Sequence, residues 1–227
     1  RSGLKAGTAR YRWDNSNCTG GWGTAFADNA SITLSTEWDH ILYLCAEDNA
    51  GNTQTWNGTY RLDKTNPVLS ANNTSALWKN ADINITLSAS DALSGLNAWT
   101  VKYRWDNADC VGWGTVFVNG ASITLSTEWQ HTLYLCAADN AGNTFTWNSN
   151  QYKLDKTDPV LSANNTSALW KNADINITLS ASDAWGSSLN PPTVKYRWRS
   201  EERRVGKKGC VTGGSRWSPT HWKKNLY

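Results

Sequence analysis

The chain has 227 residues, enough for one large domain or about two of ordinary size. Its 15 Trp residues, 39% hydrophobic content and only 5 Pro residues exclude a largely disordered chain. The net charge of +3 is unevenly placed: residues 199–227 carry 8 Lys/Arg against 2 Asp/Glu, which leaves 14 against 17 for residues 1–198. The body of the chain therefore gives no electrostatic reason to expect a nucleic-acid partner.

No stretch reaches the roughly 20 apolar residues that a membrane helix needs, so no membrane insertion is predicted in this segment. The chain contains no Met and opens without an apolar leader. We therefore expect it to be an internal piece of a longer protein, so that any anchor would belong to the parent chain.

An internal repeat with a spacing of about 92 residues is the strongest signal. The stretch "DKTNPVLSANNTSALWKNADINITLSASDA" at 63–92 recurs at 155–184 with one change, and "LYLCA-DNAGNT" occurs at both 42–53 and 133–144. The order of these blocks makes residues 1–62 the C-terminal part of a repeat unit, 63–154 a complete unit and 155–198 the N-terminal part of a third. We call these the first, complete and third copies.

Within the complete copy the hydrophobic period is two, which predicts strands rather than helices. Apolar and polar residues alternate in "INITLSAS" at 83–90 and in "VKYRW" at 101–105, and further strands are expected at 122–126, 132–137 and within 144–154. Turn residues separate them. About seven short strands in such a unit predict an all-β, immunoglobulin-like sandwich, with a small closed barrel as the alternative.

Cysteines recur in pairs within the copies. Cys18 and Cys45 lie 27 residues apart, and Cys110 and Cys136 lie 26 apart at corresponding places, whereas Cys210 has no counterpart. One disulfide per copy is therefore predicted, joining the segment after "YRW" to the "LYLCA" strand. Such bridges indicate an extracellular or cell-surface location. A structural zinc site is excluded because two Cys and one His per copy fall short of four ligands.

Three blocks together, "LDKTNPV", "SASDALSG" and "HTLYLCAADNAGNT", resemble the bacterial-type immunoglobulin-like repeats found in tandem on prokaryotic surface proteins. The resemblance covers residues 1–198, and its most specific part is "A-x-D-N-A-G-N" at 46–52 and 137–143. It implies stalk, adhesive or accessory modules without catalytic residues of their own. This chain departs from the pattern in its Cys pair and in "AWGSSLN" at 184–190.

Acidic residues recur at predicted loop and strand ends, in positions that an immunoglobulin topology would bring to the junction between units. Oxygen ligands gathered there could hold calcium and stiffen the array. The alternative is that these Asp residues form turns by bonding their own backbone. The candidate calcium residues are Asp63, Asp91, Asp139, Asp155 and Asp183, with Asp48 as the counterpart of Asp139 in the first copy.

Tryptophan dominates the aromatic residues. Most of these side chains are expected to fill the space between two thin sheets. Some could instead form a stacking platform for sugars, and Trp113 and Trp129, which lie near predicted turns, are the candidates.

Catalysis has no support in the residues, because no Ser/His/Asp spacing or carboxylate pair is tied to a pocket. His40 and His131 are expected to be structural. The sequence therefore predicts a non-enzymatic structural or adhesive segment, a stalk or spacer, of a larger prokaryotic surface or secreted protein. Its expected partners are the neighbouring repeats, with a glycan or a host surface ligand as a further candidate. A carbohydrate-binding accessory module of a secreted enzyme is the alternative.

The last 29 residues break the repeat after Trp198. "RSEERRVGK" at 199–207 and "SRWSP" at 215–219 resemble the translation of a sequencing adapter. Residues 199–227 are therefore predicted to be a disordered, non-native tail, with a genuine basic tail as the alternative.

Overall fold

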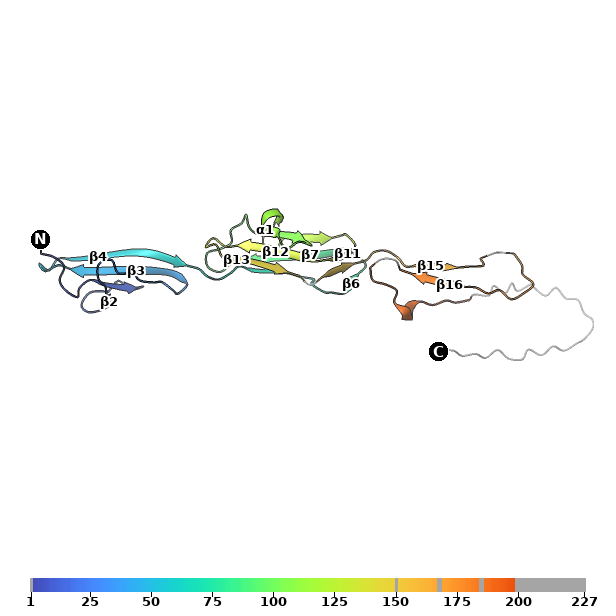
Figure 1. Cartoon of the computed structure of the whole chain (residues 1–227), viewed down its shortest axis with the longest axis horizontal. Coiled ribbons are helices and arrows are strands. Elements are labelled where there is room, and N and C mark those ends of the chain that lie inside the picture. Colours follow the sequence, from blue (N-terminus) through green and yellow to red (C-terminus); the bar gives the residue numbers. More distant parts are fainter. Residues whose placement is uncertain (1, 150, 167–168, 184–185, 199–227) are drawn as a thin grey trace, which may run out of the picture. The chain divides into compact units, whose positions relative to one another are not determined.

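The computed structural model describes residues 2–149, 151–166, 169–183 and 186–198. The described residues up to 189 belong to one compact unit, and those from 190 to 198 belong to a second. The prediction for the tail, 199–227, lies outside the described residues. Across the described part of the chain the secondary structure is almost entirely β, so the all-β prediction is confirmed (Figure 1).

The first copy forms one antiparallel sheet with the strand order β2-β1-β3-β4. Residues 31–35, which repeat the "SITLS" of the complete copy, form no strand. The reason is that the strand partner of that segment comes from the N-terminal part of the repeat, which this copy does not contain. The strands are β1 (Arg10–Trp13), β2 (Thr24–Ala25), β3 (Trp38–Glu47) and β4 (Thr53–Leu62).

The complete copy forms three small sheets with the strand orders β10-β7-β5, β13-β12-β8-β9 and β11-β14-β6. All pairings are antiparallel except that of β14 with β6. Each sheet has two edge strands, so the alternative prediction of a small closed β-barrel is wrong. Its elements are β5 (Val68–Ala71), β6 (Trp78–Lys79), β7 (Ile83–Ser90), β8 (Lys102–Trp105), α1 (Cys110–Trp113), β9 (Thr115–Val116), β10 (Ser122–Leu125), β11 (Trp129–His131), β12 (Leu133–Ala138), β13 (Thr144–Asn148) and β14 (Tyr152–Leu154).

The core of the complete copy lies between these sheets in a sandwich-like arrangement. Strand β7 buries every second residue, as its alternating sequence predicts, and β12 and β14 supply the facing side chains. Tyr152 is fully buried, and its hydroxyl donates a 2.9 Å hydrogen bond to the backbone oxygen of Asn72. Burial raises the pKa of Tyr152 to about 12. This bond joins the end of the copy to its beginning.

The third copy contains β15 (Val160–Ala163) and β16 (Leu179–Ser182), which pair with each other. In the second compact unit, the described residues hold one 3-10 helix, η1 (Pro191–Thr193). Residues 194–198 repeat the β8 sequence but form no strand. In the complete copy β8 pairs with β9 and β12, and residues 155–198 contain no counterpart of either strand.

Both predicted disulfides are present. Cys18 bonds to Cys45 with a Cα separation of 5.7 Å, and Cys110 bonds to Cys136 with a separation of 5.8 Å. Each bridge joins the segment after the Trp-ending strand, β1 or β8, to the long central strand, β3 or β12. All four Cys residues are buried.

Candidate functional site

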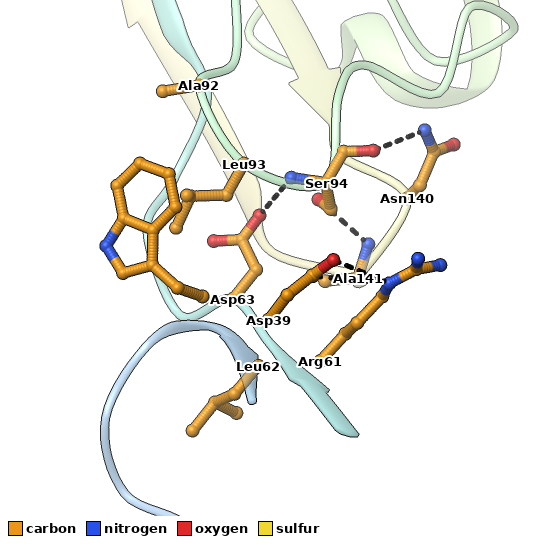
Figure 2. A pocket seen from close by; sticks show the side chains of 10 residues that line it. Asp39, Arg61, Leu62, Asp63, Ala92, Leu93, Ser94, Asn140 and Ala141 are labelled. Carbon is orange, nitrogen blue, oxygen red and sulfur yellow. Dashed lines mark hydrogen bonds and ion pairs between the residues drawn. The ribbon is translucent and has the colours of Figure 1, made fainter. Parts of the chain in front are cut away.

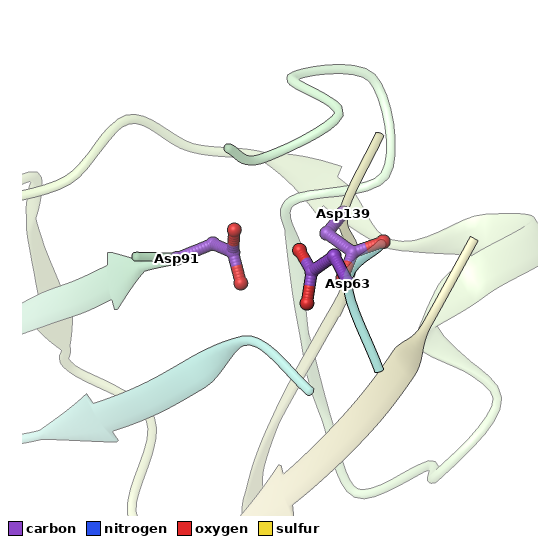
Figure 3. A group of neighbouring side chains, drawn as sticks. All are labelled: Asp63, Asp91 and Asp139. Carbon is purple, nitrogen blue, oxygen red and sulfur yellow. The ribbon is translucent and has the colours of Figure 1, made fainter. Parts of the chain in front are cut away.

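Three of the candidate calcium ligands lie together where the first copy leads into the complete copy. Asp63 directly follows β4, Asp91 follows β7 and Asp139 follows β12, and one carboxylate oxygen from each lies within 4.8 Å of the others (Figure 3). Asp139 is buried and the other two are half-buried. Among the described residues, none of the three makes an ion pair with a Lys or Arg side chain.

The same carboxylates also make the turn bonds that the alternative interpretation expects. Oδ1 of Asp91 accepts hydrogen bonds from the N–H groups of Leu93 and Gly95, at 3.2 and 2.7 Å. Oδ1 of Asp139 accepts bonds from Ala141 and Asn143, at 2.9 and 2.8 Å. The turn-forming role is therefore present, and calcium binding stays a prediction.

Asp63 is the first residue of a linker that we define as Asp-Lys-Thr at 63–65, and it ties this linker to the complete copy. Its Oδ2 accepts a 2.9 Å bond from the N–H of Ser94, and its backbone oxygen accepts a 3.1 Å bond from the Asn143 side chain. Its Oδ1 accepts a bond from the N–H of Thr65 at 2.9 Å. Hydrogen bonding from Ser94, and to a smaller extent from Thr65, lowers the pKa of Asp63 against the opposing effect of burial.

A second linker, Asp-Lys-Thr at 155–157, repeats this arrangement at the start of the third copy. Asp155 accepts bonds from the N–H of Ser187 at 2.7 Å and of Thr157 at 3.1 Å, and bonding from Ser187 lowers its pKa. The stretch "AWGSSLN" differs from the corresponding "ALSGLN" of the complete copy, yet its Ser187 gives Asp155 the backbone N–H bond that Ser94 gives Asp63. Asp183 is half-buried, and its buried Oδ1 has no hydrogen-bond partner within the described part of the chain.

The preceding copy holds each linker from the other side through a glutamate that the sequence analysis did not identify. Glu37 accepts bonds from the N–H of Lys64 at 2.6 Å and from the hydroxyl of Thr65 at 3.0 and 3.1 Å. Glu128 accepts the equivalent bonds from Lys156 at 2.5 Å and from Thr157 at 3.1 and 3.2 Å. The repetition of "STEW" at 35–38 and 126–129 was the available signal.

Each Lys of the two linkers is also held by its side chain. The Lys64 Nζ donates to the backbone oxygen of Ser35 at 3.0 Å, and the Lys156 Nζ donates to that of Ser126 at 2.8 Å. Lys156 additionally forms a 2.9 Å ion pair with Asp82. Every residue of the linker therefore has a polar contact, at both junctions.

A histidine contacts the backbone of each of these glutamates. In the first copy, Nδ1 of His40 lies 2.7 Å from a carboxylate oxygen of Asp14 and Nε2 lies 3.1 Å from the backbone oxygen of Glu37. Both ring nitrogens face acceptors, which only the protonated imidazole satisfies fully. Asp14 accordingly raises the pKa of His40, and His40 lowers that of Asp14. His131, Asp106 and Glu128 repeat these contacts at 2.6 and 3.2 Å.

The two candidate sugar-stacking residues lie on different elements. Trp113 ends α1 and is largely exposed, whereas Trp129 begins β11 with a φ of +104°. Trp129 lines a cleft of about 290 Å³ together with Leu154, Asp155 and Gly186. A positive φ is rare for a bulky residue, and such strained positions are concentrated at functional sites.

The equivalent residue of the first copy, Trp38, was missed by the sequence analysis although it lies in the same repeated word. Its φ is +102°, and it lines a larger cleft of about 620 Å³. Figure 2 shows the polar side of this cleft, where Asp63 reaches Ser94 and Asp39 pairs with Arg61. Aromatic and hydrogen-bonding side chains therefore line one cleft.

Comparison with known proteins gave no match among family models, curated proteins or solved structures. Within the described residues, no helix is both long enough and apolar enough to cross a membrane.

Proposed function

We propose that this chain is a non-enzymatic spacer or adhesive segment of a larger extracellular or surface protein, built from tandem immunoglobulin-like repeats. The observation that carries the proposal is the linker: at two junctions, the same residue types of the preceding and the following copy bind Asp-Lys-Thr. A linker bound from both sides resists bending, which is the property a spacer needs. The two disulfides are compatible with an oxidising, extracellular environment.

The test is whether the first and complete copies tumble together in solution. Backbone ¹⁵N relaxation of the full chain should give one shared correlation time for β3 and β12. The double variant Glu37→Ala/Glu128→Ala should give separate, shorter correlation times, because each linker loses its bonds to the glutamate carboxylate of the preceding copy and keeps only contacts of the Lys side chain with that copy. Glu47→Ala is the matched control, since its exposed ion pair with Lys5 lies within one copy. Separate correlation times in the unmodified chain would contradict the spacer function.

Carbohydrate binding is the second candidate, and the clefts around Trp38 and Trp129 favour it. Both indoles begin a strand in a strained conformation beside acidic and polar side chains, and stacking plus hydrogen bonding is how proteins bind sugars. Binding of a hit from a glycan array should weaken at least tenfold in Trp38→Ala or Trp129→Ala, and Trp113→Ala tests separately whether the exposed indole on α1 takes part. Trp99→Ala is the control, because Trp99 is exposed and lines neither cleft. A blank array, or an equal loss in the control, would overturn this candidate.

A further inference from the structure

The segment Ser-Thr-Glu-Trp at 35–38, which leads into β3, is contacted from two directions. The linker contacts it through Lys64, whose N–H donates to the Glu37 carboxylate and whose side chain donates to the backbone oxygen of Ser35. From the other direction, Nε2 of His40 lies 3.1 Å from the backbone oxygen of Glu37. The linker and the imidazole are therefore connected through one short segment of backbone.

The peptide group between Glu37 and Trp38 has a strained conformation. The φ of Trp38 is +102°, and a positive φ in a bulky residue persists only where the surrounding contacts fix it. The oxygen of this peptide group is the atom that faces His40. The imidazole is therefore one of the contacts that hold the strained peptide group, and with it Glu37, in position.

The complete copy repeats this arrangement in the segment 126–129. The φ of Trp129 is +104°, and Nε2 of His131 lies 3.2 Å from the backbone oxygen of Glu128. The Glu128 carboxylate accepts the N–H of Lys156 from the second linker. Two separate junctions thus combine a strained peptide group, a histidine and a glutamate that binds the linker.

The two nitrogens of each imidazole face different acceptors. Nδ1 of His40 lies 2.7 Å from the Asp14 carboxylate, whereas Nε2 faces the neutral backbone oxygen of Glu37. A neutral imidazole carries a single N–H, and a carboxylate binds that N–H more strongly than a carbonyl does. The remaining proton therefore stays on Nδ1. Loss of the other proton turns the Nε2 lone pair toward the Glu37 oxygen, so that a hydrogen bond is replaced by repulsion between two acceptors.

The groups around each ring set the pH at which this change occurs. Among the described residues, Asp14 is the acidic side chain bonded to His40, and this bond raises the pKa of His40 above its ordinary value of 6.5. The change in the first copy should therefore occur above pH 6.5. The other groups that face His40 are Glu37, the indole of Trp13 and, opposite in the strand register, Tyr60. The corresponding groups around His131 are Asp106, Glu128, Trp105 and Tyr152.

We propose that His40 and His131 make the stiffness of the two junctions depend on pH. The protonated imidazole holds the glutamate in position to bind the linker, and loss of the Nε2 proton lets the strained peptide group relax and releases the glutamate. The chain is then stiff in mildly acidic solution and bends at its junctions in alkaline solution. The histidines are positioning residues, because they act on the linker through the glutamates. The inference rests on the spacer function, since it concerns the same linker contacts.

The first experiment follows the amide protons of Lys64 and Lys156, which are bonded to the two glutamates, by solvent-exchange NMR of the full chain from pH 5.5 to 8.5. Histidine is the side chain whose ordinary pKa lies in this range. After correction for the base-catalysed intrinsic rate, protection of both amides should fall by about tenfold, with a midpoint that matches the titration of the histidine ring protons. The amide of Asn143, bonded to the Asp139 carboxylate at 2.8 Å, is the control and should keep its protection. Constant protection of the two Lys amides would overturn the proposal.

The second experiment separates the proton from the bulk of the side chain. His40→Gln/His131→Gln keeps an N–H donor for the glutamate oxygens but loses no proton in this range, so protection of the two Lys amides should not change with pH. His40→Ala/His131→Ala removes the donor, so their protection should be low throughout. Protection of the Asn143 amide verifies that the complete copy stays folded in both variants. A Gln variant that keeps the pH dependence would contradict the proposal.

Backbone ¹⁵N relaxation of β3 and β12 distinguishes failure of this inference from failure of the spacer function. The unmodified chain should give one shared correlation time at pH 5.5 and separate, shorter correlation times at pH 8.5. A shared correlation time at both pH values would overturn the pH dependence and leave the spacer function standing. Separate correlation times at both would overturn the two together, because no stiff junction would then exist to be released.

Discussion

The complete copy and the two partial copies show what one sequence does with and without its partner strands. Ile83, Ile85 and Leu87 fill the core of the complete copy, whereas in the third copy their counterparts Ile175 and Leu179 are exposed and Ile177 is half-buried. The strand itself shortens from Ile83–Ser90 to Leu179–Ser182. Local sequence thus sets the alternation of side chains, but a facing sheet is needed to extend the strand and bury its apolar side.

The largest predicted difference is the loss of unfolding free energy when a corresponding leucine is replaced in the complete copy and in the third copy. Leu87→Ala should lower the free energy of unfolding of the complete copy by about 2–5 kcal/mol, because the side chain is fully buried. Leu179→Ala should cost less than about 0.5 kcal/mol, because its side chain is exposed. Amide exchange of β7 and of β16, at a concentration where the chain is monomeric, measures both. Equal costs would mean that the third copy is buried in solution.

Removing the disulfides tests the same comparison for the first copy. The Cys110→Ala/Cys136→Ala variant should lose roughly 3–4 kcal/mol and keep its fold, because a large core remains. The Cys18→Ala/Cys45→Ala variant should lose the first copy's sheet entirely, since Leu42 is then the one buried apolar residue left there among those described. Circular dichroism and amide exchange of β3 and β12 distinguish the two results. An intact β3 without its bridge would show that the sheet is stable by itself.

Gly114 and Gly23 occupy corresponding positions of the repeat, and replacing either with Ala should destabilise its own copy. A Cβ at Gly114 would lie 2.5 Å from the backbone oxygen of Cys110, and one at Gly23 would lie 2.8 Å from that of Tyr11. Gly114→Ala should therefore cost about 1–3 kcal/mol, and Gly23→Ala at least as much because its φ is +91°. Gly112→Ala is the control: the new Cβ would make only ordinary contacts, and Ala favours the helix. Thermal unfolding checks all three, and a neutral Gly114→Ala would contradict the close contacts.

The sequence was sufficient for the features that depend on period and on repetition. The alternation in "INITLSAS" predicted β7, and paired spacing predicted both disulfides. It was not sufficient for the linker contacts, because Glu37 binds Lys64 and Thr65 across 27 and 28 residues and no local pattern marks such a pair. Trp38 was overlooked for a related reason: its positive φ is a property of the folded backbone and leaves no trace in composition.

The smallest predicted effect is the pH dependence of the His40–Asp14 pair, which lies within the first copy and should not need the missing part of the repeat. Asp14 raises the pKa of His40, so this contribution to stability is complete below about pH 6.5 and is lost as the pH rises through the raised value. His40 lowers the pKa of Asp14, so the contribution of that carboxylate is present above about pH 4 and is lost as the pH falls through the lowered value.

The pair should therefore stabilise β3 most between about pH 4 and 6.5. A titration of the His40 ring protons by NMR should give a pKa above the ordinary value, and Asp14→Asn should bring it down. His40→Gln is the second variant: it keeps a donor but cannot be charged, so its stability should lose the pH dependence assigned to the pair. An unchanged His40 pKa in Asp14→Asn would contradict the prediction, because Asp14 would then not be the group that raises it. The contact of His40 with the Glu37 backbone oxygen would then be the one that holds the imidazole.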